Sequence, residues 1–101
     1  MKKLLILITL LTGIGSAAQA GVDKQYQTWI SDIVEDAMKT RTYWASDLSF
    51  WVENPGFSKF ELESFGHQIC GGTAHKTGFY VITFWHSLNN GGEIAKVKCS
   101  S

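Results

Sequence analysis

The stretch FYVITFWHSLNNGGEIAKVKC, residues 79–99, decides the fold, because it joins two apolar runs through a strong turn signal. Residues 79–88 are rich in aromatic and β-branched side chains, which favour a β-strand. Asn89-Asn90-Gly91-Gly92 follows, and an Asn-Gly pair tolerates the positive φ angles of a type I′ turn. Residues 93–99 return as a second strand. The pattern predicts an antiparallel hairpin centred on Asn90-Gly91.

This hairpin predicts two faces of different chemistry. A turn centred on Asn90-Gly91 pairs Phe84 with Val97, and directly opposed residues share a face of a sheet. The face expected to lie under a helix carries Tyr80, Ile82, Phe84, His86, Ala95, Val97 and Cys99. The opposite face has an apolar centre and a basic outer strand, and it is the candidate binding face: Phe79, Val81, Trp85, Ile94, Lys96 and Lys98. The sequence leaves open whether residues 48–52 cover this second face.

Residues 22–44 predict one long amphipathic helix. Apolar side chains recur there at helical steps: Val22, Tyr26, Trp29, Ile30, Ile33, Ala37 and Trp44. Asp23 is suited to the N-cap position. The polar side of this helix is acidic, whereas a membrane-surface helix is rich in lysine and arginine. We therefore expect the helix to pack on a sheet.

Between the predicted helix and the hairpin, the period at which apolar residues recur changes from 3.6 to 2 residues. Residues 48–52 form a short apolar run, which the turn Asn54-Pro55-Gly56 ends. Residues 60–65 alternate apolar and polar side chains and predict a half-buried strand, with a loop from Cys70 to Gly78. The expected fold is α+β: one long N-terminal helix packed on a three- to four-stranded antiparallel meander, with one disulfide.

Cys70 and Cys99 are the only two cysteines, so a single intramolecular pairing exists. In the chain-entropy model a loop of roughly 30 residues stabilises the fold by about 3.5 kcal/mol. Cys70 is expected in or beside the 71–78 loop, which would fold across the end of the sheet to reach Cys99. A redox pair is disfavoured, because the spacing is unlike Cys-x-x-Cys.

Residues 1–20 have the organisation of a cleaved signal peptide. Met1-Lys2-Lys3 is a basic start, residues 4–11 are almost wholly apolar, and Ala18-Gln19-Ala20 is a small-x-small cleavage site. The alternative is an uncleaved anchor, but a span needs about 20 apolar residues. We expect residues 21–101 to form one periplasmic or secreted domain, with the membrane involved only in export and with disulfides permitted.

The amino-acid composition disfavours some classes of function. Loss of Lys2 and Lys3 with the signal leaves seven basic against nine acidic residues, a formal charge of about −2, and Arg41 is the only arginine. A nucleic-acid partner is therefore disfavoured, because phosphate binding needs a dense basic patch. All four tryptophans, three tyrosines and six phenylalanines lie after residue 20. Such large rings compensate for the small core of a short domain.

Catalytic signals are weak. His67, His75 and His86 are weak candidates for a three-histidine zinc site, but their spacing matches no common ligand pattern. Glu61 and Glu63 fall on a polar face, where carboxylates are usually solvated. No cofactor motif is present, and an enzyme is less expected than a binding protein.

The function expected from these observations is recognition of another protein, as an inhibitor, an immunity or exclusion factor, or an accessory subunit. An apolar patch rimmed by charge is typical of such sites. Two alternatives remain: a domain that binds a glycan or other small ligand in an aromatic groove, and a metal-dependent hydrolase. Oligomeric state is not predicted.

Overall fold

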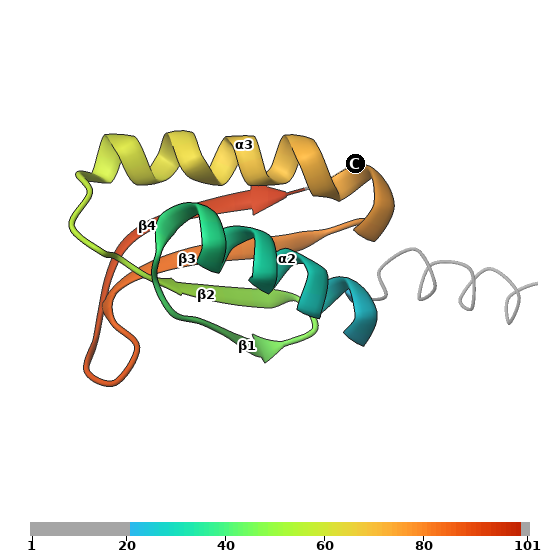
Figure 1. Ribbon diagram of the computed structural model, residues 1–101, viewed down its shortest axis with the longest axis horizontal. Helices are drawn as coiled ribbons and strands as arrows, with labels where there is room; N and C mark the ends of the chain where they lie inside the picture. The colour runs from blue at the N-terminus through green and yellow to red at the C-terminus, as the bar shows by residue number, and fades with distance from the viewer. Residues whose placement is uncertain (1–20, 100–101) are drawn as a thin grey trace, which may run out of the picture.

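The structure is a computed structural model that describes residues 21–99, with residues 74–76 described by their backbone alone. This part of the chain runs through two helices and four strands: α2 (Lys24–Met38), β1 (Thr42–Ser46), β2 (Ser49–Glu53), α3 (Lys59–Thr77), β3 (Tyr80–Ser87) and β4 (Gly91–Cys99). The strands form one sheet in the order β1-β2-β3-β4. Both helices lie on the same side of the sheet, so the fold is α+β with two layers (Figure 1).

The sheet is mixed, and the predicted purely antiparallel meander is wrong. β1 pairs with β2 and β3 pairs with β4 in antiparallel fashion, but β2 and β3 are parallel. Parallel neighbours need a crossover connection of a dozen or more residues, usually a helix. Here residues 54–79 supply that connection, and α3 lies within it.

Helix α3 replaces both the strand predicted at residues 60–65 and the loop predicted at residues 71–78. A capping box starts it: the Ser58 N–H donates to Glu61 Oε1 at 2.9 Å, and the Glu61 N–H donates to Ser58 Oγ at 3.2 Å. Lys59 pairs with Glu63 one turn later at 2.9 Å. Of the alternating apolar residues, Leu62 is buried and Phe60 is 77% exposed, and the buried stripe of the helix includes Leu62, Gly66 and Thr73.

Helix α2 is shorter than predicted. It ends at Met38, because Lys39 takes the left-handed conformation at φ 56° and donates its N–H to the Glu35 carbonyl at 2.9 Å. Its buried stripe consists of Ile30, Val34 and Met38. The predicted single helix through residue 44 is wrong, since residues 42–46 form strand β1.

Trp44 nevertheless joins the helical layer to the sheet. From β1, its indole N–H donates to the Gln27 carbonyl at 3.0 Å, and its ring lies 4.5 Å from Phe50 and 5.5 Å from Tyr80 between centroids. The core lies between the two layers, and its largest fully buried side chains are Tyr80, Phe50 and Phe84.

Gly66 sets the distance between α3 and β4. A Cβ atom at this position would lie 2.6 Å from Val97 Cγ2, closer than any real contact. A glycine is therefore required here for the helix to approach the strand, although glycine weakens a helix interior.

The β3–β4 hairpin has the predicted faces but not the predicted register. Ile82 pairs with Val97 and Phe84 with Ala95, a displacement of two residues along β4 that preserves the alternation. The positive φ angles fall on Gly91 and Gly92, not on the asparagines. A bulge follows Phe84, and His86, expected under the helix, is exposed near the end of β3.

The predicted pairing of Cys70 with Cys99 is confirmed, at a Cα–Cα distance of 5.0 Å. Its expected location is wrong, because Cys70 lies inside α3 rather than in a loop. Cys99 lies opposite Tyr80, at the start of β3. The bridge therefore fastens α3 to the end of β4.

The predicted signal peptide, residues 1–20, lies outside the described residues. Within the part of the chain that the structure describes, neither helix is long and apolar enough to cross a membrane.

Candidate binding surface

The sheet face opposite the helices is not covered by any element among residues 21–99. Strand pairing places on it ten residues, which we call the open face: Tyr43, Ser49, Trp51, Glu53, Val81, Thr83, Trp85, Glu93, Lys96 and Lys98. Residues 48–52, the possible cover in the sequence interpretation, form part of strand β2. Phe50 and Val52 face the core and Trp51 faces outward, so this segment extends the open face.

Three aromatic rings form a row across the open face, one from each of β1, β2 and β3. Tyr43 lies directly opposite Trp51, with ring centroids 5.9 Å apart. Trp51 meets Trp85 edge-on at 5.1 Å. Tyr43 is 58% exposed, whereas the two indole rings are half-buried against each other. The row is thus a packed aromatic platform with one exposed end.

The Trp85 indole N–H is buried and has no hydrogen-bond partner among the described residues. Buried donors are paired in most native structures, because leaving one unpaired costs about 1–3 kcal/mol.

The predicted binding face divides into two groups. Val81, Trp85, Lys96 and Lys98 lie on the open face, the lysines being exposed. Phe79 is half-buried and precedes β3. Ile94 packs against the core cluster, because the bulge in β4 lets Glu93 take the position opposite Trp85.

Tyr43, Trp51 and Arg41 are the site residues that the sequence interpretation missed. Tyr43 fell within the predicted helix, although Thr42-Tyr43-Trp44 is a run of β-branched and aromatic residues that favours a strand. That run follows Lys39-Thr40 after the last helical turn. It was the signal from which strand β1, and with it the position of Tyr43, could have been predicted.

A cavity of about 340 Å³ opens at the Tyr43 end of the aromatic row. Its walls come from β1, β2 and the turn of the β3–β4 hairpin: Arg41, Thr42, Tyr43, Trp51, Leu88 and Asn89. We call it the hairpin cavity. It combines two aromatic rings with a guanidinium and an amide, and Arg41 carries the only ionic side chain in its lining.

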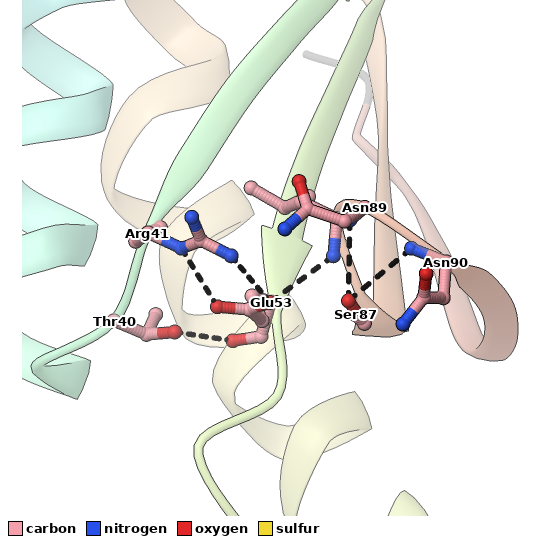
Figure 2. A network of polar contacts seen from close by, with 7 residues as sticks. Thr40, Arg41, Glu53, Ser87, Asn89 and Asn90 are labelled. Atoms are coloured by element: carbon pink, nitrogen blue, oxygen red, sulfur yellow. Dashed lines mark hydrogen bonds and ion pairs between the residues drawn. The ribbon is translucent and has the colours of Figure 1, made fainter.

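A polar network centred on Glu53 fixes the walls of the hairpin cavity (Figure 2). Arg41 donates from Nε and Nη2 to the two carboxylate oxygens of Glu53, each at 2.9 Å. The Leu88 N–H donates to the same carboxylate at 3.1 Å, and the Thr40 hydroxyl donates to the Glu53 carbonyl at 2.6 Å. One side chain thus holds the entry to β1, the end of β2 and the hairpin turn together.

The network also sets the charge of the cavity. The hydrogen bond from Arg41, followed by that from the Leu88 backbone, lowers the pKa of Glu53 to about 2. The same pairing raises the pKa of Arg41. Both groups are therefore ionised at neutral pH, and their charges cancel.

The hairpin turn is held by Ser87, whose hydroxyl accepts the N–H of Asn89 at 3.1 Å and that of Asn90 at 3.3 Å (Figure 2). Among residues 21–99, the side-chain amide of Asn89 has no hydrogen-bond partner, so it is available to a ligand.

The catalytic candidates do not meet in one place. His67 is exposed on α3, His86 is exposed on β3, and the side chain of His75 lies outside the described residues. Among the described side chains, no three of His, Cys, Asp or Glu are grouped to hold a metal ion. Glu61 caps α3 and Glu63 pairs with Lys59.

The helical layer differs in chemistry from the open face. Its solvent-facing side carries Asp32, Glu35 and Asp36, all exposed. It also carries Phe60, which is 77% exposed at the start of α3. Phe60 provides a comparison for Tyr43, since each is an exposed ring and the two belong to different layers.

We compared the chain with protein-family models, with curated proteins and with solved structures, and found no significant match in any of the three.

Proposed function

We propose that this protein is a small, exported, non-enzymatic binding module that recognises a partner protein through its open face. The observation that carries the proposal is the aromatic row Tyr43–Trp51–Trp85 on a sheet face that no described element covers. Tryptophan, tyrosine and arginine are the residue types that contribute most to protein–protein binding energy. Here they lie side by side at one surface.

The charges around the row favour a partner with an acidic rim. Lys98 has no ion-pair partner among residues 21–99, and Lys96 meets Glu93 only at 3.6 Å with both side chains about half exposed. Glu53 is paired with Arg41 and Glu93 lies beside Lys96, so Lys98 leaves one unpaired positive charge as a cationic margin of the open face. Such a margin accelerates association with a complementary surface and selects against basic partners.

The strands and the two indole rings of the platform are packed before a partner binds. Each ring of the row lies on a paired strand, and the Cys70–Cys99 bridge fastens the end of β4 to α3. The packed rings of Trp51 and Trp85 therefore have less side-chain freedom to lose when a partner docks, which favours affinity. The disulfide also fits a protein that matures in an oxidising compartment, as the signal-like residues 1–20 suggest.

The test compares two exposed rings, one in each layer. Immobilised wild type, Tyr43→Ala and Phe60→Ala proteins are incubated with an extract of the exported proteins of the source cell, and stoichiometric partners are identified by mass. We expect wild type and Phe60→Ala to capture the same partner and Tyr43→Ala to lose it. Thermal melts of the three proteins check that each is folded.

Two results would overturn the proposal. One is the absence of any stoichiometric partner for the folded wild type. The other is a partner retained by Tyr43→Ala and lost by Phe60→Ala, which would assign binding to the helical layer. The charge reversal Lys98→Glu supplies an independent check, because it should slow association without changing the melting temperature.

A further inference from the structure

We infer that the hairpin cavity binds a neutral saccharide ring. This inference goes beyond the proposed function, because it concerns a small ligand at the margin of the open face. It depends on the shape, charge and lining of a cavity that the protein-recognition proposal does not require.

The size of the cavity suits one or two sugar rings. Small-molecule pockets in proteins usually measure about 300–1,000 Å³. At about 340 Å³, the hairpin cavity lies at the small end of this range. A lipid chain or a folded polypeptide element would not be enclosed by it.

The charge of the cavity disfavours an ionic ligand. Arg41 is the only ionic residue in the lining, and Glu53 engages its Nε and Nη2 groups at 2.9 Å and balances its charge. An anionic ligand would gain little from this guanidinium, because the Glu53 carboxylate already balances its charge. A cationic ligand would meet Glu53 only after displacing Arg41 from the carboxylate.

The lining matches the two-sided chemistry of a pyranose. One face of a sugar ring presents C–H groups that pack on aromatic rings, and Tyr43 and Trp51 supply such rings. The rim of a sugar presents hydroxyl groups, for which Asn89 supplies an unpartnered amide and Arg41 supplies its remaining N–H groups. A purely apolar ligand would make no use of either polar group.

Two walls of the cavity, Trp51 and the backbone of the hairpin turn, are held by contacts within the protein. Trp51 is packed between Tyr43 and Trp85, and the Glu53 network holds the hairpin turn through the Leu88 N–H. Ordering of the site on binding therefore costs little conformational entropy.

The experiment is a titration of the whole protein, followed by tryptophan fluorescence because Trp51 lines the cavity. The probes are the neutral disaccharides chitobiose, cellobiose and maltose, with galacturonic acid and adenosine as an anionic and a planar comparison. We expect a saturable change with at least one neutral disaccharide and none with galacturonic acid.

Two neighbouring asparagines make a matched pair of variants. Asn89 and Asn90 are both exposed, and both backbone N–H groups bond to Ser87, but only Asn89 lines the cavity. Asn89→Ala should raise the Kd about tenfold, the equivalent of one lost hydrogen-bonding group, whereas Asn90→Ala should leave it within about twofold. Tyr43→Phe should retain binding that Tyr43→Ala loses.

Absence of saturable binding by every disaccharide at about 10 mM would overturn the inference, as would binding of adenosine alone. Equal effects of Asn89→Ala and Asn90→Ala would place the ligand outside the cavity. Because Asn89 lies outside the aromatic row, Asn89→Ala should keep the captured partner protein, so the two proposals fail separately.

Discussion

Arg41 and Glu53 form a two-pronged ion pair at 2.9 Å across the end of the β1–β2 ladder. The carboxylate also receives the Leu88 N–H, so the pair extends to the β3–β4 hairpin. Glu53 is therefore a titratable group that links three segments of the sheet, and this predicts a pH dependence of stability.

The pKa of Glu53 is about 2 in the folded protein and 4.5 in the unfolded reference. A lowered carboxyl pKa stabilises the fold above the unfolded value, and that stabilisation is lost as the pH falls from 4.5 toward 2. We therefore expect Glu53→Gln to have a lower melting temperature than wild type at about pH 6, with the difference shrinking below pH 4.5. Melting temperatures measured across this range check the prediction, and a difference that stays constant contradicts it.

Glu93→Gln is the control for this series. Its carboxylate lies 3.6 Å from Lys96, and both side chains are about half exposed. Exposed ion pairs of this kind contribute about 0–1 kcal/mol. Its melting curve should stay close to that of wild type throughout the same pH range.

The hydrogen bond between Thr73 and Tyr80 predicts that two conservative substitutions destabilise the protein by different amounts. The Thr73 hydroxyl donates to the Ile69 carbonyl at 2.7 Å, so the 2.6 Å contact with Tyr80 is a bond that the tyrosine donates. Tyr80→Phe should cost about 1 kcal/mol, because Thr73 keeps its bond to Ile69. Thr73→Val should cost more, about 1–3 kcal/mol, because it leaves the buried tyrosine O–H unpaired.

Urea unfolding of these two variants and the double variant measures the effect. The double variant should be more stable than Thr73→Val alone, since it removes the unpaired hydroxyl. Equal destabilisation by the two single variants would contradict the assigned donor direction.

Replacing each of two glycines of α3 by alanine should change the stability of the protein in opposite directions. Gly66→Ala places a Cβ atom 2.6 Å from Val97 Cγ2 and should destabilise the protein by about 1–3 kcal/mol. Gly71→Ala meets nothing within 4 Å and should stabilise it by about 0.5–1 kcal/mol through higher helix propensity. Chemical denaturation of both variants checks the sign, and stabilisation by Gly66→Ala would show that α3 does not approach β4 this closely.

Because of the disulfide, we expect a large loss of stability when both cysteines are removed. The bridge joins residues 29 positions apart, and a loop of that length contributes about 3.5 kcal/mol in the chain-entropy model. The double variant Cys70→Ala/Cys99→Ala should unfold at a correspondingly lower urea concentration than the oxidised wild type. The same midpoint for both proteins would indicate that α3 and β4 are held together by packing alone.

The local sequence pattern was sufficient to predict the structure wherever residues that are close in the chain are also close in space. The hairpin at residues 79–99 and its two faces were predictable, because alternation survives a register displacement of two residues. The disulfide was predictable because only one pairing exists. On the open face, Val81, Trp85, Lys96 and Lys98 followed from the same alternation.

Helix α3 could not be read from periodicity alone. Its residues alternate over a short distance, and three glycines lower its helix propensity. The capping box at Ser58 and Glu61 was the one local signal, whereas the need for Gly66 exists only because Val97 approaches the helix. Replacing the expected strand by a helix made β2 and β3 parallel neighbours.

The sequence by itself determined a two-layer α+β domain, one cystine and the two chemistries of the final hairpin, since each depends on periodicity or on a single possible pairing. Only the tertiary structure decided that Tyr43, Trp51 and Trp85 form one row and that Arg41 and Asn89 share a cavity. These residues come from three separate segments, and their proximity arises from strand order and a crossover helix. That order is set by which apolar surfaces can be buried together, a property of the whole chain that no local pattern contains.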